Sequence, residues 1–172
     1  MPRAVLIGPP GSGKSSVARA LAKALSCTFI DTDSVIEEVA HKTIKAIFAQ
    51  DGEPRFREIE EEVVLGVLAS EPGVVALGGG SILSKEVREV LSLKRYPVIY
   101  LTVSANQAVA RVSKSDARPL LSNDPQRVWL DLLNQRAHIY EELADLTIST
   151  DNRKAIEISQ ELCEKLDMGE SS

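Results

Sequence analysis

The feature that most constrains the fold of this chain is a continuous apolar run that ends in a glycine-rich segment. Residues 4–7 read AVLI, and residues 8–15 read GPPGSGKS. Residues 14–25 then carry apolar side chains at four-residue spacing. The apolar run predicts a buried parallel strand, and the spacing predicts an amphipathic helix. The segment between them matches the phosphate-binding loop, in which two glycines enclose four residues and precede Lys-Ser.

Each residue type in this loop has a physical reason to be there. Glycines let the backbone approach a ligand closely, and consecutive N–H groups form a concave site for anions. The helix that follows directs the positive end of its dipole toward the same site. We expect Lys14 to reach the β- and γ-phosphates of ATP and the Ser15 hydroxyl to bind Mg²⁺. The residues expected to bind the nucleotide are Gly11, Ser12, Gly13, Lys14, Ser15 and Ser16.

The rest of the chain alternates short apolar runs with longer amphipathic stretches. This alternation predicts a parallel sheet that is covered by helices on both faces. The fold class is therefore α/β, a three-layer α/β/α sandwich with a five-stranded parallel sheet, in a single domain that spans residues 1–172. Strands are expected at residues 4–7, 28–30, 73–77, 97–101 and 146–149, and helices at 14–25, 34–48 (one or two), 53–69, 84–93, 106–112, 125–143 and 153–166.

The composition narrows the class of protein. The net charge is −5 and aromatic residues make up 4% of the chain, which argues against a nucleic-acid-binding surface. Cys27 and Cys163 are far apart and lie outside any metal-binding spacing, as in a reducing compartment. No apolar run reaches the length of a membrane span. We expect a cytoplasmic monomer that has small-molecule substrates and neither a nucleic-acid nor a membrane partner.

The acceptor of the phosphoryl group has to be read from other residues, because kinases, ATPases and GTPases share the phosphate-binding loop. Asp31 and Asp33 follow the second expected strand, and ligands of open α/β sheets bind at the carboxyl ends of strands. One carboxylate can hold Mg²⁺, and the other can orient or deprotonate an acceptor hydroxyl. The alternative is a structural role for this pair as an Asx-turn or a helix N-cap.

Two further segments are candidates for the substrate site. Arg57 lies on the expected helix 53–69, either as a ligand for a carboxylate or as a solvated charge paired with Glu53 or Glu61. The triple glycine Gly78, Gly79 and Gly80 follows the third strand. It indicates a backbone that comes very close to another group, with substrate as the expected one, or else a flexible connector.

Three more arginines are candidates for binding anions. Residues 113–124 are polar and lack periodicity, so we expect a mobile lid in which Arg118 closes over ATP. Arg111 lies just upstream and can face the nucleotide, and Arg136 on the next expected helix can meet the substrate's anion. Each of these arginines can equally be an exposed charge. Trp129, on an apolar face of the same helix, is interpreted as a core residue.

Taken together, these motifs resemble the shikimate kinase family over nearly the whole chain. The resemblance rests on their order and separations, and it includes Ile47-Phe48, Gly52-Glu53 and Arg118-Pro119-Leu120-Leu121 besides the segments above. The residues that carry it are 8–15, 31–33, 47–48, 52–53, 56–57, 78–80, 118–121, Arg136 and Tyr140.

The resemblance implies a P-loop kinase with a lid, of the nucleoside-monophosphate-kinase-like fold, with substrate-binding helices over residues 33–62. It implies transfer of the γ-phosphoryl group of MgATP to the 3-hydroxyl of shikimate, on the pathway to chorismate and the aromatic amino acids. The catalytic residues would be Lys14, Asp33 and the lid residue Arg118. Shikimate would be bound by Asp33, Arg57, Gly78, Gly79, Gly80 and Arg136, Mg²⁺ by Ser15 and Asp31, and the adenine side of ATP by Arg111 and Arg153.

Three rival functions stay open on the residues alone. Another small-molecule kinase of this fold, such as a gluconate kinase, would also act on an acceptor molecule that carries a carboxylate. A regulatory nucleotide-binding module would bind ATP or GTP without an acceptor, although the guanine motif Asn-Lys-x-Asp is absent from the sequence. An ATPase acting on nucleic acid would need a basic stripe with aromatic residues.

Overall fold

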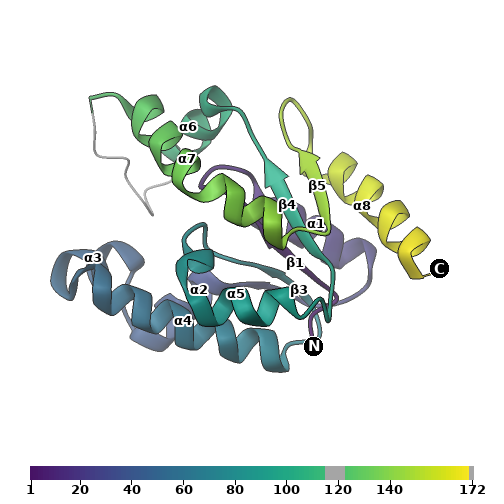
Figure 1. Ribbon diagram of the computed structural model, residues 1–172, viewed down its shortest axis with the longest axis horizontal. Helices are drawn as coiled ribbons and strands as arrows, with labels where there is room; N and C mark the ends of the chain where they lie inside the picture. The colour runs from purple at the N-terminus through teal and green to yellow at the C-terminus, as the bar shows by residue number, and fades with distance from the viewer. Residues whose placement is uncertain (115–122, 171–172) are drawn as a thin grey trace.

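Five parallel strands form one sheet, as the sequence predicted, and the structure gives their order as β2-β3-β1-β4-β5 (Figure 1). The computed structural model describes residues 1–114 and 123–170, with the side chains of residues 168–170 excepted. β1, which leads into the phosphate-binding loop, lies at the centre of the sheet between β3 and β4. The strands are β1 (Ala4–Ile7), β2 (Phe29–Asp31), β3 (Val74–Ala76), β4 (Val98–Thr102) and β5 (Leu146–Ser149).

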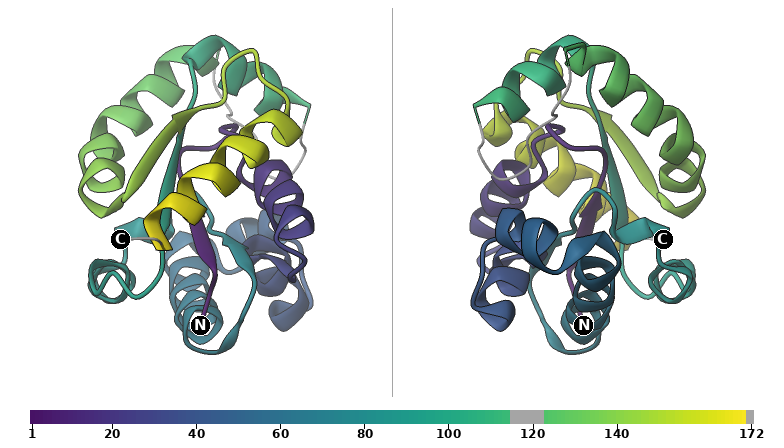
Figure 2. Two further views of the ribbon diagram at one scale, coloured as in Figure 1. Left: turned by 90° about the vertical axis from the view of Figure 1, so that its right-hand side faces the viewer. Right: turned by 90° about the vertical axis from the view of Figure 1, so that its left-hand side faces the viewer.

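Helices cover both faces of this sheet, which confirms the three layers. The helices are α1 (Lys14–Ala24), α2 (Thr32–Ala40), α3 (Ile44–Gln50), α4 (Gly52–Ser70), α5 (Lys85–Ser92), α6 (Ala105–Ser113), α7 (Pro125–Leu143) and α8 (Ala155–Glu170), with a short 3₁₀ turn at Ser81–Leu83. Successive side chains of β1 point to opposite faces, so Val5 and Ile7 join one hydrophobic core while Ala4 and Leu6 join the other. The first core is shared with α4, α5 and α7, and the second with α1 and α8, which pack side by side (Figure 2).

The region expected to hold one or two helices after β2 contains two. His41 ends α2 in the left-handed backbone conformation, with a φ of 52°. Thr43 then starts α3, since its side chain accepts a hydrogen bond from the Ala46 N–H. α2 begins at Thr32, earlier than expected, because Asp31 caps it.

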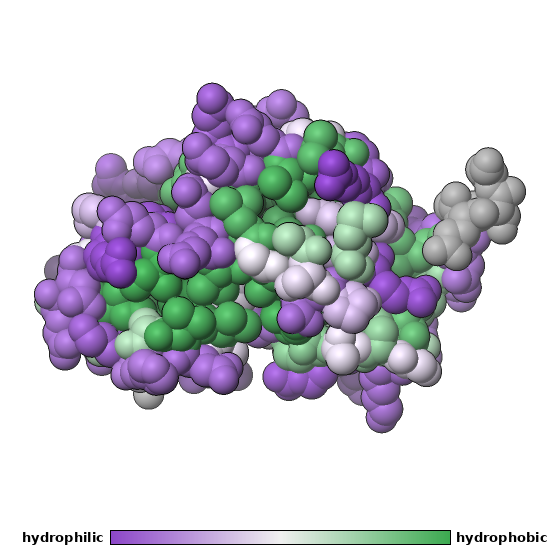
Figure 3. All heavy atoms as spheres, turned by 90° about the horizontal axis from the view of Figure 1, so that it is seen from below, coloured by the Kyte–Doolittle hydropathy of each residue, from purple (hydrophilic) through white to green (hydrophobic). Residues whose placement is uncertain are grey.

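The surface carries both polar and apolar side chains. From below in the orientation of Figure 1, apolar side chains gather in patches between polar ones (Figure 3). Within residues 1–114 and 123–170, no helix combines the length and the apolar character that crossing a membrane requires.

Candidate active site

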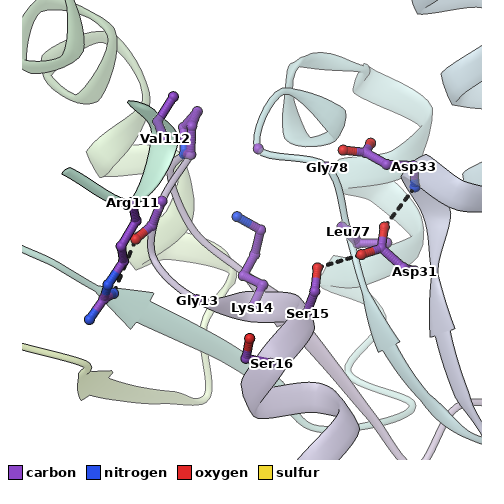
Figure 4. Close-up of a pocket in the computed structure, with 13 residues that line it drawn as sticks. Gly13, Lys14, Ser15, Ser16, Asp31, Asp33, Leu77, Gly78, Arg111 and Val112 are labelled. Carbon is purple, nitrogen blue, oxygen red and sulfur yellow. Dashed lines mark hydrogen bonds between the residues drawn. The ribbon is translucent and has the colours of Figure 1, made fainter. Parts of the chain in front are cut away.

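A cavity of about 360 Å³ lies at the carboxyl ends of β1, β2 and β3 (Figure 4). One wall is the phosphate-binding loop with the start of α1, and a second wall carries Asp31 and Asp33. Leu77, Gly78 and Gly79 follow β3 and close a third side, and the end of α6 contributes Arg111 and Val112. Segments that are far apart in the sequence therefore meet where ligands bind in open α/β sheets.

The glycines of the phosphate-binding loop are required by its backbone. Gly11 and Gly13 have φ values of 78° and 86°, in the left-handed region that side chains disfavour. Gly11 also packs against α6, because a Cβ built on it would lie 2.5 Å from the Ala108 carbonyl oxygen. Both the backbone conformation and the packing against α6 therefore require glycine at position 11.

Lys14 lies inside the curve of this loop. Its Nζ donates hydrogen bonds to the carbonyl oxygens of Gly8 at 2.8 Å and Pro9 at 3.0 Å. The ammonium group thus lies beside the loop's backbone and lines the cavity (Figure 4). A cation at this position can meet the phosphates of a nucleotide bound by the loop.

Asp31 has the capping role that the sequence left open, and it also contacts Ser15. One carboxylate oxygen caps α2 by accepting a hydrogen bond from the Asp33 N–H at 2.9 Å, and the other accepts the Ser15 hydroxyl proton (Figure 4). The pair therefore places two oxygen ligands together on the cavity wall. Mg²⁺ prefers oxygen ligands and is commonly held by one or two protein groups, with phosphates and waters completing the shell. Across the described residues, no group of three or more His, Cys, Asp or Glu could hold a metal.

Asp33 lies in the first turn of α2, and its carboxylate points into the cavity (Figure 4). The residue between the two acids, Thr32, is buried, and its hydroxyl joins the carbonyl of Ala76 at 3.3 Å and the N–H of Gly78 at 3.2 Å. This contact ties the acidic segment to the glycine segment on the neighbouring strand.

The close approach that the triple glycine predicted is found within the chain itself for Gly79 and Gly80. A Cβ on Gly79 would lie 3.1 Å from Pro10 Cδ, so this glycine lets the segment pack on the phosphate-binding loop. A Cβ on Gly80 would lie 2.2 Å from Arg57 Nη1, so this glycine makes room for the guanidinium. Gly78 and Gly79 also line the cavity.

Arg57 and Gly80 line a separate hollow of about 420 Å³ beside the main cavity. The guanidinium forms ion pairs with Glu60 at 2.5 Å and with Glu53 at 3.3 Å. The expectation of a pair with Glu53 or Glu61 is confirmed for Glu53. The pair with Glu60 was not expected, and three-residue spacing places Glu60 on the same side of α4. Arg57 is therefore a partly buried and oriented cation.

Glu60 is a residue that sequence reasoning missed. Its side chain is 3% exposed, and its second oxygen accepts a hydrogen bond from Ser81 Oγ at 2.9 Å. Its three-residue spacing from Arg57 was visible in the sequence, but three other glutamates surround it, and only burial distinguishes it. A buried carboxylate with two partners fixes the position of Arg57.

The remaining predicted arginines are in different surroundings. Arg111 lines the cavity and donates to the carbonyls of Gly11 and Thr150, both at 3.1 Å. Arg153 is not among the residues lining the cavity; it donates to Glu161 at 2.6 Å and so keeps the pKa of that carboxyl below its ordinary value. Arg136 lies half-buried on α7, where no described residue forms a hydrogen bond or an ion pair with it. Arg118 and most of the expected lid lie outside the described residues.

We expect Glu60→Ala to lower the free energy of unfolding by about 3 kcal/mol, because it breaks a buried ion pair and leaves Ser81 without its acceptor. Glu53→Ala is the matched control, since it removes an exposed partner of the same arginine and should cost less than about 1 kcal/mol. Urea unfolding of both variants measures the difference. Equal losses would contradict the structural role assigned to Glu60.

Comparison with known proteins adds independent information about the chain as a whole. The family model described as shikimate kinase matches residues 10–167, a range that includes every candidate residue of the site. The shikimate kinase of Rhodococcus jostii is 46% identical over 166 residues, covering 96% of this chain and 98% of the relative. That of Thermobifida fusca is 47% identical over 165 residues, covering 96% and 95%. The structure of Acinetobacter baumannii shikimate kinase in complex with shikimate superposes with a TM-score of 0.92 at 34% identity, covering 96% of this chain and 93% of that one.

Proposed function

The chain belongs to the shikimate kinase family, and we propose that it transfers the γ-phosphoryl group of ATP to the 3-hydroxyl of shikimate. The observation that carries this proposal is a single cavity with two kinds of wall. The phosphate-binding loop forms one wall, and Asp33 with Gly78 and Gly79 forms the opposite one. A phosphate donor and a hydroxyl acceptor can therefore meet within one cavity, and positioning of the two is the main requirement of phosphoryl transfer.

On the donor side, the loop amides of residues 11–16 bind the phosphates and Lys14 neutralises the charge that moves with the phosphoryl group. Ser15 and Asp31 would hold Mg²⁺, because the Ser15 hydroxyl and an Asp31 carboxylate oxygen already lie in hydrogen-bonding contact with each other. When bound, Mg²⁺ supplies positive charge to the β- and γ-phosphate oxygens. These groups lie at the carboxyl ends of β1, in the middle of the sheet, and of β2, at its edge.

On the acceptor side, Asp33 accepts the hydrogen bond of the shikimate 3-hydroxyl and orients or deprotonates it. Arg57 and Arg136 bind the carboxylate, for which the planar guanidinium group is well suited. Gly78, Gly79 and Gly80 present backbone to the ring between these groups. Support for Arg57 comes from Glu60 and Gly80, which hold its guanidinium in one place.

The lid residue Arg118 adds a cation over the transferring group when the segment 113–124 closes, which would exclude water and suppress ATP hydrolysis. Arg111 would bind the nucleotide, since it lines the cavity together with the phosphate-binding loop. Arg153 was predicted to lie near adenine, and in the structure its guanidinium pairs with Glu161.

Coupled ADP release with MgATP and shikimate, gluconate or no acceptor tests the proposed function. We expect ADP release that requires shikimate. Release stimulated by gluconate alone would favour a different small-molecule kinase, and nucleotide binding without stimulation by any acceptor would favour a regulatory module.

Gly80→Ala should weaken shikimate binding while leaving the fold intact. The new Cβ would lie 2.2 Å from Arg57 Nη1, and the guanidinium is the flexible end of a side chain, so it moves instead of the backbone. We expect KM for shikimate to rise about tenfold or more while KM for ATP stays within twofold, as for the loss of one charged hydrogen bond.

Gly66→Ala is the control for this prediction. A Cβ on Gly66 meets nothing within 4 Å, and alanine favours a helix interior. Steady-state kinetics on both variants makes the comparison, and an unchanged KM for shikimate in Gly80→Ala would contradict the role given to Arg57.

A further inference from the structure

Helix α7 touches both walls of the cavity through buried aromatic side chains. Trp129, which is 1% exposed, donates a hydrogen bond from Nε1 to the carbonyl oxygen of Pro10 at 2.9 Å. Tyr140, which is 0% exposed, donates from its hydroxyl to the carbonyl oxygen of Gly79 at 2.6 Å. Pro10 belongs to the phosphate-binding loop and Gly79 to the acceptor wall, so one helix holds a carbonyl of each.

These two hydrogen bonds fix the orientation of two whole peptide units as well as the positions of their carbonyl oxygens. A peptide unit is planar and trans, so its N–H lies in the same plane as its C=O and points the opposite way. The Pro10 carbonyl therefore fixes the direction of the Gly11 N–H, and the Gly79 carbonyl fixes that of the Gly80 N–H. Within the described part of the chain, neither N–H donates a hydrogen bond. Gly11 lines the cavity and Gly80 lines the neighbouring hollow, so both residues lie beside space that a ligand can occupy.

The two contacts lie on one face of α7, with Arg136 between them. Helical spacing brings residues 129, 133, 136 and 140 to the same side. Leu133 packs against the cores that contain Trp129 and Tyr140, so this face is the one that α7 turns toward the sheet. Gly79 also lies against Pro10, so the two anchored segments are in contact with each other.

We propose that Trp129 and Tyr140 are positioning residues, Trp129 for the nucleotide and Tyr140 for the acceptor. Each fixes one peptide plane whose N–H contacts a substrate, Gly11 for phosphate and Gly80 for shikimate. The proposal rests on the proposed function of this cavity. It predicts that the two aromatic residues act on different substrates, although both belong to one helix.

Trp129→Phe and Tyr140→Phe test this, because each removes one hydrogen-bond donor and keeps an aromatic ring. Tyr140→Phe should raise KM for shikimate about tenfold and leave KM for ATP within twofold, as expected for the loss of one hydrogen bond. Trp129→Phe should raise KM for ATP about tenfold and leave KM for shikimate within twofold. Calorimetric titration with shikimate alone and with MgADP alone should give the same division in Kd.

Tyr96→Phe is the matched control. Tyr96 is 5% exposed, and its hydroxyl has no hydrogen-bond partner among the described residues, so its removal should change neither KM nor Kd. If Trp129→Phe does not fold, the emission of this single tryptophan in the wild type replaces it. MgADP should then change the emission and shikimate alone should not.

The outcomes separate this proposal from the function on which it rests. A wild type without shikimate-dependent ADP release would refute the function. An active wild type whose two Phe variants raise both KM values equally, or lose stability without any change in KM, would refute the positioning roles. An emission change with shikimate and none with MgADP would do the same.

Discussion

Replacing Asp33 by asparagine should lower kcat by about 10²- to 10⁴-fold, the range expected for loss of a general base. Asparagine retains the size of the side chain, but its amide cannot take the proton of the shikimate hydroxyl. The helix cap is not affected, because Asp31 accepts the hydrogen bond from the backbone N–H of residue 33. Binding of shikimate should fall much less than kcat, since the arginines that meet its carboxylate are unchanged.

Steady-state kinetics and shikimate titration of Asp33→Asn make this measurement. Glu38→Gln is the control, because Glu38 is an exposed carboxylate on the same helix. A kcat within tenfold of wild type would mean that Asp33 only orients the hydroxyl. A loss of shikimate binding as large as the loss of kcat would mean that it is a binding residue.

Lys14→Met should lower kcat by about 10²- to 10³-fold, the effect of removing one preorganised charge from the transferring phosphoryl group. Methionine keeps most of the side-chain length but can neither carry a charge nor donate a hydrogen bond. The hydrogen bonds of Lys14 with the Gly8 and Pro9 carbonyls are lost as well, and these bonds stabilise the conformation of the loop. MgADP titration therefore accompanies the kinetics and reports any loosening of the loop.

Lys23→Met is the matched control, since Lys23 is an exposed lysine in the last turn of the same helix. It should retain full activity. If Lys14→Met loses MgADP affinity in proportion to kcat, Lys14 acts through loop structure and not through charge on the phosphoryl group.

The local elements were predictable because their causes are local. The strand, glycine loop and helix of residues 4–25 follow from neighbouring residues, and the structure has β1 and α1 there. The helix end at His41 was not specified in advance, since a left-handed non-glycine residue leaves little signal in a sequence.

The site was predictable to the extent that parallel strands end at one edge of the sheet. That rule placed Asp31, Asp33 and the triple glycine beside the phosphate-binding loop. Asp31, Asp33, Gly78 and Gly79 line one cavity, and Gly80 lines the neighbouring hollow. The rule says nothing of side-chain pairing. It could not show that Glu60 is the buried partner of Arg57, or that Arg153 pairs with Glu161.

The sequence by itself therefore determined the succession of strands and helices along the chain, the phosphate-binding loop and the acidic residues at the ends of strands. Only the tertiary structure decided what the glycines approach, which carboxylate holds Arg57 and which aromatic residues hold the two loop carbonyls. The physical reason is that backbone conformation and apolar periodicity act between near neighbours. Burial and hydrogen bonding join α4, α7 and the loops only when the chain has folded.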